Sequence, residues 1–257
     1  MTNRYFIHLG FKGTLYHGWQ VQPGSITIQE VLNNSLSRFL HEKIYCIGAG
    51  RTDAGVHAPC FYAHFDSQRN DLHQDPNFLF KLNCILPKDI AVYSIFPVEP
   101  ESHARFNATS RTYLYRISQI KDPFNQEFAK FLSKKIDIDK MNVAAEILMT
   151  YIDFTSFSKS NTDVKTNNCT ITHAKWTTSG TELHFTISAN RFLRNMVRAI
   201  VGTLLDIGLG KASPESIRII IEKKQRSEAG ISVAACGLHL IKIQYPDIIL
   251  KHNHLPY

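Results

Sequence analysis

The sequence predicts an α+β fold made of two similar halves. In each half, a segment of alternating apolar residues precedes an amphipathic helix, and further strand-like segments follow that helix. Hydrophobic residues make up 44% of the 257 residues and charged residues 20%, which excludes disorder as the dominant state. We place the halves at residues 1–103 and 104–257, and their sheets could either join or pack against each other.

The first half is expected to run strand, helix, strand, loop, strand. Apolar residues alternate over residues 5–11, as in a half-buried strand. Thr27 and Glu30 then form a capping box, and apolar residues spaced three and four apart predict a helix that ends near His41. Two further strands are expected at residues 43–47 and 61–65.

The second half is expected to repeat this order and to add helices. Asp139 is the expected cap of its first helix, and Ser179-Gly180 is the expected turn between two strands. A long helix is expected from about Arg191 to Gly208 or Gly210, because glycine suits the position after a helix end. Strands are expected at 112–117, 171–177, 182–188 and 238–245, a further helix from 213–215, and a polar loop at 158–168.

The chain is basic, with 29 Lys and Arg against 22 Asp and Glu and a formal charge of +7. Its isoelectric point is near 9.1. This excess permits a polyanionic partner such as nucleic acid, although a solvated, lysine-rich surface would produce the same balance.

The cysteine and histidine patterns argue against a metal protein. The five cysteines are odd in number and form no C-x-x-C pair, so free thiols in a reducing cytosol are expected. The histidines lack zinc-site spacing, so the chemistry is expected to rest on side chains without a metal. The start of the chain does not resemble a signal peptide, and no apolar run approaches about 20 residues, which predicts a cytoplasmic protein with no membrane span.

The densest functional pattern is the segment from Gly48 to His57, between two expected strands. Its glycines allow a ligand or a second segment to approach the backbone closely. Arg51 and Asp53 place opposite charges two residues apart, and Asp53 is a candidate nucleophile or base on a rigid loop. The alternative is a tight connection in which Thr52 or Asp53 caps a short helix.

From Gly50 to His57, the run Gly-Arg-Thr-Asp-Ala-Gly-Val-His resembles the catalytic motif of the TruA family of tRNA pseudouridine synthases. Other segments resemble further motifs of this family in the expected order, over nearly the whole chain. They are Tyr16-His-Gly-Trp-Gln20, Gln29 at a helix start, His103–Thr109, Arg111–Tyr115, Asp153–Phe157, Met196-Val-Arg198 with Val201-Gly202, and Gly237–Leu240. The chain departs from the family pattern at Cys169, Arg194 and Val233–Ala235, outside the Asp53 segment.

The resemblance implies an isomerase that detaches a uracil from its ribose, rotates it and rejoins it through carbon, without a cofactor. The implied targets are uridines 38 to 40 in the anticodon stem-loop of tRNA, and the implied assembly is a homodimer. The family also implies ferredoxin-like or RRM-like halves with antiparallel sheets, which flank a basic active-site cleft.

The resemblance assigns a role to individual residues as well. It implies that Asp53 is the nucleophile, that Arg198 forms an ion pair with Asp53, and that Tyr113 stacks on the target base. An aromatic face can hold a flipped base in this way. Arg51 is the candidate to occupy the space left by the flipped base or to hold the RNA backbone, and Arg105 and His57 are candidate tRNA contacts.

The residue patterns alone leave alternatives open. Tyr113 on a strand is also typical of a sheet core, and His57 can equally hold the loop by hydrogen bonds. Arg191, Arg194 and Arg198 are spaced three and four apart, so they are expected on one helix face, which could also be a solvated basic surface. A second class of function also fits, a non-catalytic RNA-binding protein or RNA chaperone. Such a protein would not need to keep all three of Asp53, Tyr113 and Arg198.

Overall fold

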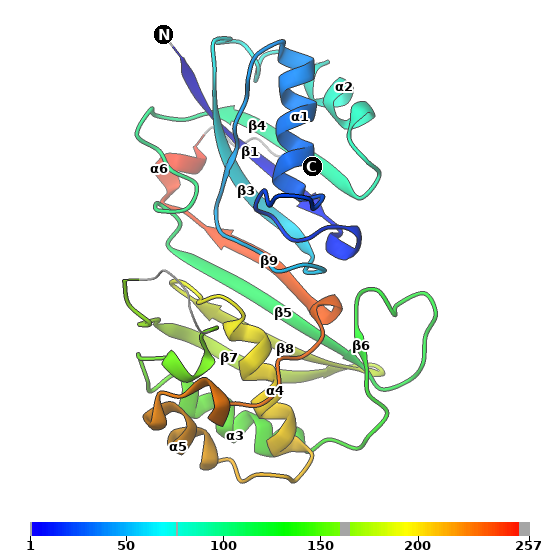
Figure 1. Ribbon diagram of the computed structural model, residues 1–257, viewed down its shortest axis with the longest axis vertical. Helices are drawn as coiled ribbons and strands as arrows, with labels where there is room; N and C mark the ends of the chain where they lie inside the picture. The colour runs from blue at the N-terminus through cyan, green and yellow to red at the C-terminus, as the bar shows by residue number, and fades with distance from the viewer. Residues whose placement is uncertain (1, 76, 160–164, 252–257) are drawn as a thin grey trace. The chain divides into compact units, whose positions relative to one another are not determined.

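The computed structural model describes residues 2–75, 77–159 and 165–251, and the chain folds into two compact units (Figure 1). The first unit combines residues 1–109 with the segment 240–257, and the second unit holds residues 110–239. The expected halves were 1–103 and 104–257, so the division falls slightly later and the last segment joins the first unit. Of the expected loop at 158–168, residues 160–164 lie outside the described part of the chain.

The first unit is built on an antiparallel four-stranded sheet with the spatial order β2-β3-β1-β4. The strands are β1 (Asn3–Phe11), β2 (Ile47–Gly48), β3 (Ala58–Ser67) and β4 (Ile90–Pro97). Helix α1 (Ile28–Leu40) follows β1, and α2 (Phe78–Ile85) lies between β3 and β4 in sequence. Both helices lie beside this sheet in Figure 1.

Helix α1 begins and ends where the sequence predicts. The Oγ1 atom of Thr27 accepts a hydrogen bond from the Glu30 N–H at 3.4 Å, as in a capping box. At the other end, His41 adopts the left-handed conformation with φ 55°, which terminates the helix. The apolar residues buried by this helix are Ile28, Leu32, Leu36 and Leu40.

The sheet of the first unit is buried on both faces, because β1 is buried along nearly its whole length. Part of the cover comes from the C-terminal segment. The Tyr245 ring packs against Phe6 and Tyr62, with ring centroids 5.5 and 5.3 Å apart. The Tyr245 hydroxyl also donates to the Ala104 carbonyl at 2.6 Å. These contacts explain why the segment 240–257 belongs to the first unit.

The second unit contains the strands β5 (Ser110–Ser118), β6 (Lys130–Phe131), β7 (Ile171–Ser179) and β8 (Glu182–Ala189). They lie in the order β6-β5-β8-β7, antiparallel except for the short β5–β6 pair. The helices are α3 (Ile138–Leu148), α4 (Met196–Gly208) and α5 (Ser216–Lys223), and α3 packs against α4 (Figure 1). Strand β9 (Leu238–Gln244) crosses the boundary between the units, and α6 (Asp247–Leu250) belongs to the first. The helices and antiparallel sheets confirm the α+β class.

Two helix starts differ from the sequence prediction. Helix α3 is capped by Asp137, whose Oδ1 accepts a hydrogen bond from the Lys140 N–H at 3.0 Å, so Asp139 lies inside the first turn. Helix α4 begins at Met196 instead of near Arg191, because Asn195 has φ 66° and interrupts the helical backbone. Within the described residues, no helix has both the length and the apolar character needed to cross a membrane.

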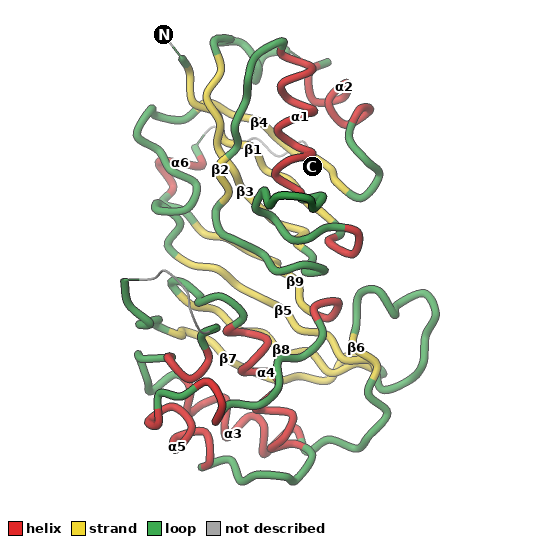
Figure 2. The backbone as a smooth tube through the Cα atoms, viewed as in Figure 1, coloured by secondary structure: helices red, strands yellow, loops and turns green. Residues whose placement is uncertain are grey.

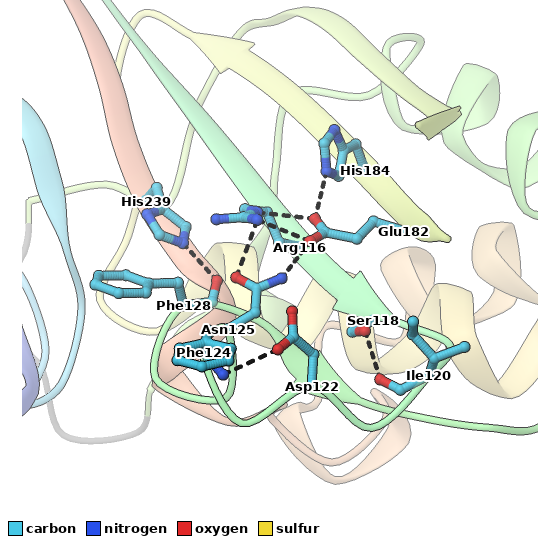
Figure 3. A network of polar contacts seen from close by, with 10 residues as sticks. All are labelled: Arg116, Ser118, Ile120, Asp122, Phe124, Asn125, Phe128, Glu182, His184 and His239. Carbon is cyan, nitrogen blue, oxygen red and sulfur yellow. Dashed lines mark hydrogen bonds and ion pairs between the residues drawn. The ribbon is translucent and has the colours of Figure 1, made fainter. Parts of the chain in front are cut away.

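A polar network anchors the connection between β5 and β6 in the second unit (Figure 3). Arg116 and Glu182, on neighbouring strands, form a bidentate ion pair with N–O distances of 2.9 and 2.8 Å. Asn125 accepts a hydrogen bond from Arg116 at 3.1 Å and donates one to Glu182, and His184 Nε2 lies 2.7 Å from the same carboxylate. The Arg116 hydrogen bond is the largest of the effects that lower the pKa of Glu182 to about 2.

Candidate active site

The segment 49–57, which we call the Asp53 loop, connects β2 to β3 without any helix (Figure 2). The Asp53 carbonyl accepts a hydrogen bond from the Val56 N–H at 3.2 Å and closes a turn. Gly55 occupies the third position of this turn with φ 78°, as a type II turn requires. The alternative in which Thr52 or Asp53 caps a short helix is therefore wrong.

A second segment crosses the Asp53 loop at backbone contact distance. Gly18 has φ 85°, and a Cβ atom at this position would lie 2.2 Å from the Thr52 carbonyl oxygen. The Trp19 N–H donates to the same oxygen at 3.4 Å, and the Gly55 N–H donates to the Tyr16 carbonyl at 3.3 Å. Only glycine combines this backbone conformation with such a close approach, which explains the Gly in the Tyr16–Gln20 motif.

His57 holds the loop in place from its C-terminal end. Its side chain is 2% exposed, and its Nδ1 accepts a hydrogen bond from the Gly13 N–H at 3.1 Å. Its carbonyl accepts another from the Leu240 N–H at 2.9 Å. Of the two roles that the sequence allows for His57, this burial favours support of the loop over direct contact with tRNA.

The loop presents its charged groups while its backbone is held. Arg51 is exposed and Asp53 is half-buried. Next to the loop, the buried Trp19 ring packs on Phe61 with centroids 4.3 Å apart, and a Cβ atom on Gly48 would lie 2.5 Å from the indole. A carboxylate on such a fixed loop can approach a reacting carbon without first being ordered.

Tyr113 lies at the margin of the core of the second unit. It pairs on the sheet with Ile187, which is buried, and cross-strand partners share a face. Two residues further along β5, Tyr115 is fully buried and donates to the Ala234 carbonyl at 2.9 Å. Tyr113 is only half-buried, and the Phe192 ring meets it edge-on with centroids 5.2 Å apart. The Tyr113 ring is thus positioned by a neighbour yet partly accessible, as a stacking residue needs to be.

Arg198 lies in the first turn of α4 and is half-buried. Its Nε donates to the Val233 carbonyl at 2.8 Å, and its own carbonyl accepts from the Val233 N–H at 3.2 Å. Burial raises the pKa of the nearby Tyr115, and the positive charge of Arg198 opposes that shift. The hydrogen bond from Nε therefore holds the guanidinium group in place near Tyr115.

The segment 226–233, whose Val233 binds Arg198, lies in direct contact with α4. A Cβ atom on Gly202 would lie 1.9 Å from the Ile231 carbonyl oxygen, so the two backbones are in direct contact. Arg226 donates to the carbonyls of Ala229 and Gly230, each at 3.2 Å. Sequence reasoning missed this support, because its hydrogen bonds join groups that no local pattern connects. The only signal was the glycine of the Val201-Gly202 pair.

The expected stripe of arginines on one helix face does not form. Arg191 and Arg194 precede α4 and therefore do not share a helix face with Arg198. Arg191 donates to the Thr166 carbonyl at 3.3 Å, and Arg194 is exposed. Nearby, Cys169 is buried, which raises the pKa of its thiol to about 11.

The candidate residues fall into two groups. The first unit holds Arg51, Asp53 and His57 on one loop and Arg105 on an exposed turn, and the second unit holds Tyr113 and Arg198. Among the described residues, no three or more His, Cys, Asp or Glu side chains are grouped so that they could hold a metal ion. Carboxylate, aromatic and guanidinium side chains are the types of group that bind and rearrange a nucleotide.

Comparisons with known proteins identify the family of the chain. The family model described as tRNA pseudouridine synthase matches residues 144–246. The protein named tRNA pseudouridine synthase A from Parabacteroides distasonis is 53% identical over 245 residues, covering 95% of this chain and 96% of its own. The protein of that name from Bacteroides fragilis is 52% identical over 251 residues, with 97% and 99% covered. A Clostridium perfringens protein named tRNA pseudouridine synthase A 2 is 37% identical over 237 residues, with 91% and 96% covered.

The matches first define the class of the protein: it is a tRNA pseudouridine synthase, and these enzymes are isomerases. Identity above 50% along nearly the whole length narrows the assignment further. The chain belongs to the TruA family, the tRNA pseudouridine synthase A enzymes. This assignment confirms the family that the motifs predict and sets aside the non-catalytic RNA-binding alternative.

Proposed function

We propose that this protein converts uridine to pseudouridine at positions 38, 39 and 40 in the anticodon stem-loop of tRNA, without a cofactor. The observation that supports the proposal most is the state of Asp53. It is a half-buried carboxylate on a loop whose backbone is fixed by Gly18, Trp19 and Tyr16. A group that must meet a reacting carbon benefits from such pre-ordering, whereas a carboxylate hinders the simple binding of RNA.

In this proposal Asp53 is the nucleophile, and the guanidinium group of Arg198 forms its ion pair. Tyr113 stacks on the uracil while it is detached and rotated. Arg51, exposed beside Asp53, fills the space left by the flipped nucleotide, and Arg105 contacts the tRNA. His57 keeps the loop in shape through Gly13 and Leu240, as its burial indicates.

The proposal extends to the architecture. Apart from the two-residue strand β6, each unit runs strand, helix, strand, strand in sequence, and the third of these strands (β3 or β8) lies between the other two. This arrangement supports two ferredoxin-like halves. We propose that they flank a basic active-site cleft to which the net charge of +7 contributes, and that the enzyme acts in the cytoplasm as a homodimer.

The direct test replaces the nucleophile. Asp53→Ala is expected to abolish pseudouridine formation while tRNA still binds, because the change removes a reacting group and leaves the phosphate contacts intact. The matched control is Asp139→Ala, an exposed acidic residue in the first turn of α3, which should retain activity. Turnover by Asp53→Ala comparable to the unaltered protein would refute the mechanism.

A second experiment tests the target positions. Pseudouridines are mapped in tRNA from cells with and without the gene for this protein. Loss at positions 38 to 40 is the expected result. Loss at other positions would refute the proposed specificity but leave the chemistry intact.

A further inference from the structure

One exposed aromatic side chain of the first unit is held in a defined place. Phe106 is 75% exposed, although phenylalanine is usually buried. The guanidinium carbon of Arg105 lies 5.7 Å from the centroid of its ring, in the range of a cation–π contact. The His103 ring lies 4.2 Å from the same ring, tilted by 34°.

The turn that carries Phe106 is closed by hydrogen bonds. The Nδ1 atom of His103 accepts from the N–H groups of Arg105 at 3.1 Å and Phe106 at 3.3 Å. The His103 N–H donates to the Asn107 side chain at 2.5 Å, and the Asn107 N–H donates back to the His103 carbonyl at 3.0 Å. Because Nδ1 accepts these two hydrogen bonds, the proton of the ring lies on Nε2, and burial favours this neutral form by lowering the pKa of His103.

Contacts from the sheet fix the same turn from its other side. The Ala104 N–H donates to Nδ1 of His64 at 3.1 Å, and the Ala104 carbonyl accepts from the Tyr245 hydroxyl at 2.6 Å. Arg4 donates to the Ser102 carbonyl at 3.2 Å. Phe106 therefore projects from a rigid base and need not be ordered when a ligand binds, which lowers the entropic cost of binding.

We propose that Phe106, with Arg105 over its ring, is a stacking platform for an unpaired base of the tRNA, separate from the base that reacts. Unpaired bases of RNA are recognised by stacking on aromatic rings and on arginine planes, and both groups are present here. The cation favours an RNA partner over an apolar protein surface, because it lies beside the ring that such a surface would have to cover. The inference rests on the proposed function and adds a second base contact to it.

The first test measures tRNA binding to the full-length protein. Phe106→Ala is expected to raise the dissociation constant for tRNA about 5- to 150-fold, the range for one lost base–aromatic stack. Phe106→Trp is expected to retain binding, because indole also stacks. The matched control is Phe124→Ala in the second unit, which removes another exposed ring, 93% accessible, and should leave the dissociation constant unchanged. Unchanged binding by Phe106→Ala would overturn the proposal.

The second test observes stacking directly. The tryptophans of the protein, Trp19 and Trp176, are 2% and 1% exposed, so a tryptophan at position 106 would be the exposed one. Its fluorescence is expected to be quenched by tRNA and not by a fully paired RNA duplex of equal length. Equal quenching by both RNAs, or none, would overturn the proposal.

The salt dependence separates the two members of the platform. Arg105→Gln removes a positive charge next to the bound RNA and is expected to lower the salt slope of tRNA binding by up to about one, whereas Phe106→Ala removes no charge and leaves the slope unchanged. The activity of Asp53→Ala and the tRNA binding of Phe106→Ala together distinguish a failure of this proposal from a failure of the proposed function. If Asp53→Ala is inactive but Phe106→Ala binds tRNA normally, the platform alone fails. If Phe106→Ala instead changes the oligomeric state and not tRNA binding, the surface is a protein interface and the proposal is wrong.

Discussion

Apart from the short strand β6, the two units share an arrangement of three strands, but they differ at the connection from β2 to β3 and from β7 to β8. In the second unit, the nine residues of β7 run straight into β8 through the Gly180-Thr181 turn. In the first unit, β2 has only two residues, and the whole Asp53 loop separates it from β3. The same position in the fold thus carries a plain hairpin in one unit and the proposed nucleophile in the other.

The first unit replaces the missing strand pairing with side-chain hydrogen bonds from α1. The Cys46 N–H donates to Asn33 Oδ1 at 2.8 Å, and the Cys46 carbonyl accepts from Gln29 at 2.6 Å. The Ile44 N–H donates to Ser37 Oγ at 2.9 Å. Buried backbone groups must find partners, and these three side chains supply them where no sheet partner does. Because these backbone groups bond to α1, only Ile47–Gly48 pair with β3 before the chain enters the Asp53 loop.

The largest effect we expect in the second unit comes from Arg198. Arg198→Lys removes the Nε donor that binds Val233, so a lysine ammonium cannot keep that contact and the one proposed with Asp53. We expect kcat to fall about 10- to 100-fold, as for the loss of one hydrogen bond to a charged group. Arg194→Lys, exposed and outside the helix, is the control and should be unaffected. Equal activity of both variants would contradict the role of Arg198.

The next effect tests the packing of the Asp53 loop. Gly18→Ala is expected to destabilise the first unit by roughly 2 to 5 kcal/mol, because it adds left-handed strain to a backbone clash at Thr52. Gly24→Ala is the control: φ is 70° but nothing lies within 4 Å, so about 1 to 2 kcal/mol of strain is expected. Denaturant unfolding followed by Trp19 fluorescence, with Trp176→Phe in both variants, reports the first unit. Equal losses would show that the loop does not depend on this crossing.

A third prediction concerns pH and the network of the second unit. The pKa of Glu182 is lowered from 4.5 to about 2, so its contribution to stability is present above pH 4.5 and is lost as the pH falls towards 2. Glu182→Gln is expected to cost up to about 3 kcal/mol near pH 7, and the two proteins should converge towards pH 2. Unfolding is followed by Trp176 fluorescence with Trp19→Phe. The exposed pair Lys211–Asp206 provides the control, since Asp206→Asn should cost under about 1 kcal/mol. A difference that persists unchanged at low pH would contradict the assignment.

The smallest effect is expected at the plain hairpin. Gly180 has φ 59° with nothing within 4 Å, so Gly180→Ala should cost about 1 to 2 kcal/mol in the second unit and leave kcat unchanged. Gly55→Ala strains the corresponding connection of the first unit, where φ is 78°, and should lower kcat as well. A loss of activity in Gly180→Ala would show that the two connections are not functionally different.

Elements defined by local patterns were predictable from the sequence. The strand at Asn3–Phe11, the helix capped by Thr27 and the hairpin around Gly180 all occur as expected. Helix α2 and strand β4 went unpredicted, although β4 alternates buried and exposed residues over Ile90–Pro97. The residues of the Asp53 loop could be named from their motif.

The remaining features depend on contacts between distant residues. The segment 43–47 has the composition of a strand, but α1 takes its hydrogen bonds and only Ile47–Gly48 pairs with the sheet. The start of α4 is set by Asn195, whose side chain donates to Ser232 at 2.6 Å, far away in the chain. A spacing of three and four residues gives no information on such a distant bond. For that reason the prediction that Arg191, Arg194 and Arg198 share one helix face was wrong.

The first unit is completed by a segment that follows the whole second unit in sequence, and this has a consequence for synthesis on the ribosome. All of the second unit, residues 110–239, is synthesised before the segment with Leu240 and Tyr245. Until that segment is present, Tyr245 does not cover Phe6 and Tyr62. The His57 carbonyl also lacks the hydrogen bond from the Leu240 N–H. A nascent chain stalled at residue 239 should therefore be more sensitive to protease in its first unit than the released protein. The Asp53 loop therefore gains the hydrogen bond between the His57 carbonyl and the Leu240 N–H only after the whole second unit has been synthesised.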